Sequence, residues 1–234
     1  MNISKKQLLT GLSIVSILSL SACSHDDNDV IEPPPSMMDY SFEVTVTNLT
    51  HSQPLSPIAV VSHGDISLWQ IGSSASVAIE TMAESGDNSQ ILANTDLISG
   101  SSGTGIILPG MSETLVINTS SESVPFLSVA TMLVNTNDAF TGRTSIDISD
   151  LAIGDNITMK AVAYDAGTEA NSEVAGTVPG PADGGEGFNA TRDDVDYVAQ
   201  HPGIVGMDDG LSTSVLTTEH RFDNPVIQLS ITRL

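Results

Sequence analysis

Phe42-Glu43-Val44-Thr45-Val46-Thr47 alternates strictly between apolar and polar residues. Because successive side chains of a β-strand point to opposite faces of a sheet, this alternation predicts a strand with one buried and one exposed face. The same pattern ends the chain, where Ile227, Leu229 and Ile231 alternate with polar residues. Pairing of these first and last strands would close the fold and bring its two ends together.

Several apolar runs between these two stretches predict further strands. They cover 58–61, 105–108, 113–118, 126–134 and 156–164, and segments rich in Gly, Asn, Ser and Pro separate them. This spacing favours a sandwich over alternating strands and helices. Short helices are predicted at 74–85 and 191–200, the second because Thr191-Arg192-Asp193-Asp194 has the pattern of a helix start. The predicted fold class is all-β, an antiparallel β-sandwich with one or two short helices.

The N-terminus has the pattern of a secretory signal peptide. Lys5 and Lys6 precede an apolar stretch at 8–20, which ends in Leu20-Ser21-Ala22-Cys23. This stretch is shorter than the about 20 apolar residues that a membrane-spanning helix needs. We therefore predict a signal peptide at 1–22.

Cys23 is the only cysteine, which excludes a disulfide within the chain. Leu20-Ser21-Ala22-Cys23 resembles the bacterial lipobox, and the resemblance implies that Cys23 is lipidated and becomes the mature N-terminus. Ser24 stands where an aspartate would be the usual signal for retention at the inner membrane. The resemblance thus implies export and a lipid anchor in the bacterial outer membrane, with the protein periplasmic or surface-exposed. Several acyl chains anchor a protein stably where a single chain is marginal.

Residues 23–39 are predicted to form a tether. They are polar and acidic and contain Pro33-Pro34-Pro35, so that few residues are able to build a core. The remaining residues, 40–234, have the length of a single all-β domain. We find neither an internal repeat nor a second domain.

The chain is strongly acidic, with 29 Asp and Glu against 7 Lys and Arg and a net charge of −22. Loss of Lys5 and Lys6 with the signal peptide leaves 5 basic residues, so the mature net charge is 5 − 29 = −24. Such a surface repels nucleic acid but attracts divalent cations wherever carboxylates converge. An acidic surface also keeps an exported protein soluble, which accounts for most of these residues.

Two acidic stretches follow apolar, strand-like runs at 129–134 and 159–164. Asp138 lies in the stretch 135–142, and Asp165 and Glu169 lie in Tyr164-Asp165-Ala166-Gly167-Thr168-Glu169. If the preceding runs are neighbouring strands, these three carboxylates converge at one end of a sheet. Converging carboxylates repel unless a cation holds them, and hard oxygen ligands on flexible loops suit calcium. The alternative is a simple turn in which Asp165 bonds its own backbone two residues on.

The pattern Asn137-Asp138-Ala139-Phe140-Thr141-Gly142 followed by Tyr164-Asp165-Ala166-Gly167-Thr168-Glu169 resembles the spondin domain, a calcium-binding β-sandwich of F-spondin and of bacterial secreted proteins. The resemblance extends over most of 42–234 and implies calcium held by Asp138, Asp165 and Glu169. Glu169 departs from the aspartate of the eukaryotic pattern. Glutamate reaches farther and often binds bidentately, so a site with altered geometry is implied.

Two classes of function fit these observations. The first is a non-enzymatic calcium-binding lipoprotein module of the cell envelope, for adhesion or recognition of an extracellular matrix, polysaccharide or protein ligand. Calcium would order the loop end of the sandwich. The alternative is a carboxylate-dependent hydrolase of envelope or extracellular polysaccharide, with Asp138 and Glu169 in acid–base roles. Bound metal would keep both carboxylates ionised, and aromatic residues form only 4% of the chain, so we expect the non-enzymatic module.

Overall fold

The computed structural model describes residues 36–234, which form ten strands, two short α-helices and two short 3-10 helices. Their order is β1 (Met38–Asn48), β2 (Ala59–His63), α1 (Val77–Ser85), α2 (Ser89–Leu92), β3 (Leu97–Ser102), β4 (Ser112–Ser121), β5 (Phe126–Met132), β6 (Ala139–Asp147), β7 (Asn156–Ala161), β8 (Ala163–Asp165), β9 (Ala199–Gln200), η1 (Met207–Asp209), η2 (Thr218–His220) and β10 (Ile227–Arg233).

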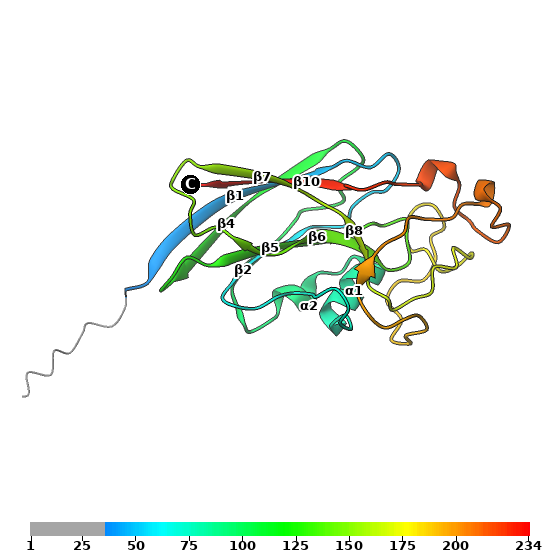
Figure 1. The fold of residues 1–234 in the computed structure, drawn as a ribbon, viewed down its shortest axis with the longest axis horizontal. Helices are drawn as coiled ribbons and strands as arrows, with labels where there is room; N and C mark the ends of the chain where they lie inside the picture. The colour runs from blue at the N-terminus through cyan, green and yellow to red at the C-terminus, as the bar shows by residue number, and fades with distance from the viewer. Residues whose placement is uncertain (1–35) are drawn as a thin grey trace, which may run out of the picture. The chain divides into compact units, whose positions relative to one another are not determined.

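These strands form two antiparallel sheets, which confirms the predicted all-β sandwich (Figure 1). The four-stranded sheet has the order β4-β1-β10-β7, and the six-stranded sheet has the order β3-β2-β5-β6-β8-β9. The predicted pairing of the first and last strands is confirmed, since β1 and β10 pair antiparallel from Phe42↔Arg233 to Asn48↔Ile227. β1 begins at Met38, within the predicted tether 23–39.

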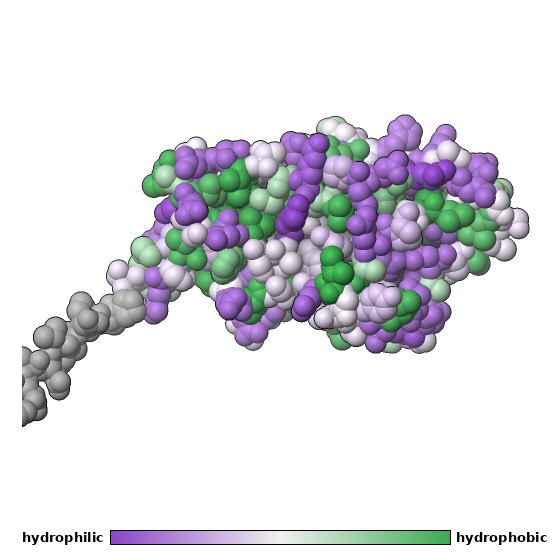
Figure 2. Space-filling view, in the orientation of Figure 1, coloured by the Kyte–Doolittle hydropathy of each residue, from purple (hydrophilic) through white to green (hydrophobic). Residues whose placement is uncertain are grey.

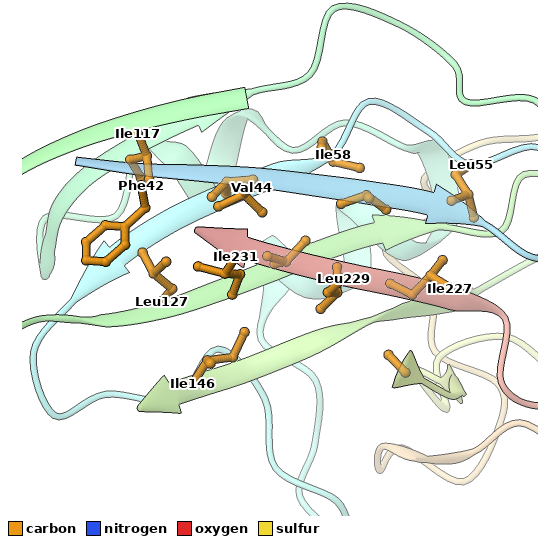
Figure 3. Close-up of a cluster of buried hydrophobic side chains, with 14 of the residues drawn as sticks. Phe42, Val44, Leu55, Ile58, Ile117, Leu127, Ile146, Ile227, Leu229 and Ile231 are labelled. Carbon is orange, nitrogen blue, oxygen red and sulfur yellow. The ribbon is translucent and has the colours of Figure 1, made fainter. Parts of the chain in front are cut away.

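The main core lies between the two sheets (Figure 3). The alternating apolar residues of β1 and β10 are fully buried there, as their pattern predicts. They pack against the inner face of the six-stranded sheet, and the residues drawn in Figure 3 include Phe42, Val44, Leu127, Ile146, Leu229 and Ile231. This core holds the strands from whose ends the acidic residues project.

A second core lies on the other face of the six-stranded sheet, where α1 packs. The predicted helix at 74–85 is confirmed from Val77 to Ser85: the Ser76 hydroxyl caps it by accepting a hydrogen bond from the Ile79 amide, and Gly86 ends it with φ of 73°. Trp69 lies in this core, 5.2 Å edge-on from Phe140. The six-stranded sheet is therefore covered on both faces.

Four expectations about single elements are wrong. The segment 191–200 forms no helix and ends in β9. The runs 129–134 and 159–164 are not neighbours, because β6 lies between β5 and β8. The run 156–164 splits after Ala161 into β7 and β8, which belong to different sheets. The run 105–108 makes only an isolated bridge between Ile107 and Leu55.

The predicted signal peptide at 1–22, Cys23 and the tether up to residue 35 lie outside the described residues. Among residues 36–234, none of the helices has the length and apolar character that crossing a bilayer requires.

Candidate metal centre

The two predicted acidic stretches are side by side in the structure. Asp138 immediately precedes β6, and Asp165 is the last residue of β8. β6 and β8 pair antiparallel with Ala139 opposite Asp165, so Asp138 and Asp165 meet at one end of the six-stranded sheet. The convergence follows from a strand pair that differs from the predicted one.

Asp138 is fully buried, and its two carboxylate oxygens differ. Oδ2 accepts hydrogen bonds from the backbone amides of Thr168 and Glu169, at 2.9 and 3.1 Å. Oδ1 has no hydrogen-bond partner in the described part of the protein. Burial raises the pKa of Asp138 to about 7, the neighbouring charge of Asp165 adds to the rise, and the two backbone amides oppose it.

Asp165 is also buried, and both of its carboxylate oxygens accept hydrogen bonds. The Gly167 amide donates to Oδ1 at 2.7 Å, which is the turn expected as the alternative to a metal site. The Asn171 amide group donates to Oδ2 at 2.6 Å. A hydrogen-bonded carboxylate oxygen retains a second lone pair, so the turn does not prevent Asp165 from contacting a cation.

Glu169 lies at a pocket of about 190 Å³, whose lining includes Asn137, Glu186, Asn189 and Asp193. Burial raises the pKa of Glu169 to about 8, and the negative charges of Glu84, Asp138, Asp193 and Glu186 raise it further, in that order. The carboxyl group thus sits among other carboxyls with no basic residue along the pocket wall.

Glu84 is a site residue that the sequence reasoning missed. It lies on α1, is fully buried, and accepts a hydrogen bond from the Asn189 amide at 2.8 Å through Oε2, while Oε1 has no partner among the described residues. Burial raises its pKa. The sequence contains one indication of a special role for Glu84. Glu80 and Glu84 are like charges four residues apart, and such a pair is unfavourable on an exposed helix unless the side chains have other partners.

Asn137 supplies a third unsatisfied oxygen. Its amide nitrogen donates to the backbone carbonyls of Glu169 and Ala170 at 3.2 and 3.1 Å, which turns the side chain toward the acidic loop. Its Oδ1 is buried and has no partner within residues 36–234. Buried oxygens without partners are costly, and Glu84, Asn137 and Asp138 each have one. Oxygens of this type are the ligands that calcium prefers.

The acidic side chains of the site do not come together as one set of metal ligands in the described structure. Within residues 36–234, no three His, Cys, Asp or Glu side chains stand in an arrangement that could already hold an ion.

The acidic loop also supports the neighbouring segment 193–198. The amides of Asp193 and Asp196 donate to the carbonyls of Thr168 and Gly167, at 3.0 and 2.8 Å. Gly167 has φ of 70° and lies so close to the Tyr197 backbone that a side chain would collide with it. The loop 165–169 and the segment 193–198 are thus held together by backbone contacts.

Comparison of the chain with models of protein families finds no match, and a search of curated proteins finds no relative. The class of site therefore rests on its geometry: a buried, oxygen-rich acidic centre at one end of a β-sandwich.

Proposed function

We propose that this protein is a non-enzymatic calcium-binding module of the cell envelope, in which calcium orders the loop end of the sandwich for ligand recognition or adhesion. The observation that supports it best is the set of three buried oxygens without partners, on Glu84, Asn137 and Asp138. A calcium ion would satisfy them and neutralise the carboxyl groups that burial and crowding otherwise destabilise when ionised. The resemblance to spondin domains points to the same site.

The proposed ligand set combines the predicted residues with those that the structure adds. Asp138, Asp165 and Glu169 remain the carboxylates expected to bind calcium. Glu84 and Asn137 supplement them, because each has a free, buried oxygen. Calcium takes six to eight oxygen ligands in flexible geometry, so five side chains and backbone carbonyls form a reasonable set.

Calcium titration by calorimetry tests this proposal. We expect the wild-type protein to bind calcium with a defined stoichiometry, and Asp138→Asn and Glu84→Gln each to weaken binding at least about tenfold, because each removes a charged oxygen ligand. Asp150→Asn, at an exposed aspartate outside the site, is the matched control and should bind as the wild type does. Absence of binding heat, together with a melting temperature that a chelator leaves unchanged, would refute the proposal.

The alternative hydrolase has one observation in its favour. A carboxyl group whose pKa is raised to about 8 is protonated at neutral pH and can donate a proton, and Glu169 lies at a pocket. Its predicted partner Asp138, however, is fully buried and cannot touch a substrate without rearrangement. The geometry therefore supports the binding module better. If the wild-type protein hydrolyses envelope polysaccharide and Glu169→Gln abolishes that activity, the hydrolase would be the better supported function.

The proposed location rests on the sequence of the first 23 residues. We propose that the protein is exported and anchored to the outer membrane through a lipid on Cys23. Metabolic labelling with an alkyne-bearing palmitate should label the wild-type protein in the membrane fraction. Cys23→Ala should remove the label and release the protein from that fraction. An unlabelled wild-type protein would show that the lipid is absent.

A further inference from the structure

A second pocket, outside the metal centre, lies between the end of β9 and the segment that precedes β10. Its volume is about 440 Å³, within the range of small-ligand sites. Gln200, His201, Phe222, Asp223 and Asn224 line it, together with a Pro-Gly pair. Neither predicted acidic stretch contributes a side chain to this lining.

The backbone of one residue in β8 fixes both walls of this pocket. The Ala163 carbonyl accepts a hydrogen bond from the His201 amide at 3.0 Å, and the Ala163 amide donates to Asn224 Oδ1 at 2.7 Å. The His201 ring is buried, accepts a hydrogen bond from the Gly203 amide through Nδ1 at 3.0 Å, and packs on Phe222 with 5.4 Å between ring centroids. Both walls are therefore anchored to the sheet through Ala163.

Several other polar groups at this pocket have no partner in the described part of the protein. Within residues 36–234, the side chains of Gln200 and Asp223 and the amide nitrogen of Asn224 make no hydrogen bond and no ion pair. Together they offer amide donors, an amide acceptor and a carboxylate acceptor beside Phe222, a partly exposed residue that also packs against buried core residues.

We infer that this pocket binds a neutral sugar ring, such as a pyranose at the end or branch of a glycan. Hydroxyl groups both donate and accept hydrogen bonds, so the free amides and the carboxylate match them, and an aromatic ring packs on the apolar face of a sugar. Lys and Arg are absent from the lining of the pocket in the described structure, and the net charge of −22 disfavours anionic ligands. On the face drawn in Figure 2, hydrophobic residues are scattered among hydrophilic ones, without a broad apolar surface for protein docking.

This inference rests on the proposed function only in that it gives the recognition module a ligand; calcium takes no part in it.

The test is saturation-transfer NMR of the protein with methyl glucoside, methyl galactoside, methyl mannoside and methyl N-acetylglucosaminide at millimolar concentration, and with glucuronate as the anionic comparison. We expect transfer to at least one neutral glycoside, little transfer to glucuronate, and the same result with calcium or with chelator.

Variants assign the binding to this pocket. Phe222→Leu removes the aromatic face, and Asp223→Asn removes the charged acceptor at an exposed position. Each should weaken binding about tenfold. Phe188→Leu, at an exposed phenylalanine elsewhere, should leave binding unchanged.

The inference is overturned if no neutral glycoside shows transfer, if glucuronate binds equally well, or if both pocket variants bind as the wild type does. Sugar binding in a protein without calcium binding would sustain the inference and refute only the metal site.

Discussion

Asp138 is subject to two opposing influences. Burial and the charge of Asp165 favour its protonated form, whereas the amides of Thr168 and Glu169 favour the carboxylate. Those two amides come from the loop that carries the other acidic residues, so the loop is already turned toward an anion at this position. A residue that is prepared for a negative charge but only half ionised near neutrality is suited to respond to a cation.

The raised pKa values make the stability of the calcium-free protein depend on pH. The pKa of Asp138 rises from 3.8 to about 7 and that of Glu169 from 4.5 to about 8 on folding. Between these values the folded state binds more protons than the unfolded state, so the free energy of unfolding falls as the pH increases. We expect the melting temperature in chelator to fall by about 5 °C from pH 5 to pH 8, mostly through the buried Asp138. Solvent screens the partly exposed Glu169.

Saturating calcium should remove this decline, because the cation then neutralises the carboxylates in place of protons. Differential scanning fluorimetry in chelator and in calcium measures both curves. A melting temperature that rises or stays constant from pH 5 to pH 8 in chelator would show that these carboxyls are not destabilised by ionisation.

At the scale of elements, β1 and β10 were predictable because one face is buried and the other is exposed, whereas β3 (Leu97–Ser102) was missed. β1 and β10 show this alternation in full, and both were found from sequence. β6 was missed because its first residues, Ala139–Gly142, are buried on both faces and therefore do not alternate. The prediction of a helix at 191–200 is wrong because its residues interact with distant parts of the chain. The Arg192 side chain donates a hydrogen bond to Glu80, and the Asp193 carboxylate accepts one from the Ala170 amide.

The same reasoning explains how much of the site could be foreseen. Asp138 precedes β6 and Asp165 ends β8. Residues at the ends of paired strands can lie together at one end of the sheet, so their meeting could be predicted. Glu84 reaches the site only because α1 packs on the six-stranded sheet, and no local pattern encodes that packing. The separation of β7 from β8 is equally non-local, since an unbroken apolar run is compatible with one strand or with two.

The ion pair between α1 and the segment 191–198 provides a prediction at this scale. Arg192 bonds Glu80 and Asp196, each at 2.5 Å, and the Glu80 side chain is 4% exposed. Arg192→Gln leaves the Glu80 charge buried without its partner, so we expect a loss of about 2–3 kcal/mol in the free energy of unfolding. Arg221→Gln breaks a solvent-exposed pair with Asp209 and should cost about 0.5 kcal/mol or less. Urea unfolding measures both, and equal losses would contradict the structural distinction.

At the scale of the whole domain, regular and irregular structure are separated. The two sheets and α1 share large cores, whereas the segment 166–225, yellow to red-orange at the loop-rich end in Figure 1, contains mainly loops around a small cluster of Val178, Ile204 and Leu216. Local stability follows buried apolar contact, so this segment should open more readily than the sheets. This segment contains Glu169 of the proposed metal centre and all residues that line the proposed sugar pocket.

Hydrogen exchange measured by mass spectrometry tests this division. We expect amides of 166–198 to exchange faster than those of β1, β4 and β10 in chelator, and calcium to slow them without changing exchange in those strands. The physical reason is that calcium would bind the loop residues, whereas the sheets are already held by their core. Uniform slowing over the entire domain would indicate instead that calcium acts on global unfolding alone.

The transfer of the chain from one sheet to the other at Val162 has a mechanical consequence. β7 lies beside β10 in the four-stranded sheet, and three residues after Val162 the chain reaches Asp165. The Val162 carbonyl accepts a hydrogen bond from the Thr141 hydroxyl at 2.9 Å, which ties the backbone at this junction to β6. We therefore expect a force applied to β10 to reach the acidic loop through β7. An ion that clamps this loop would act as a latch, and the force that the domain withstands would report the calcium concentration around it.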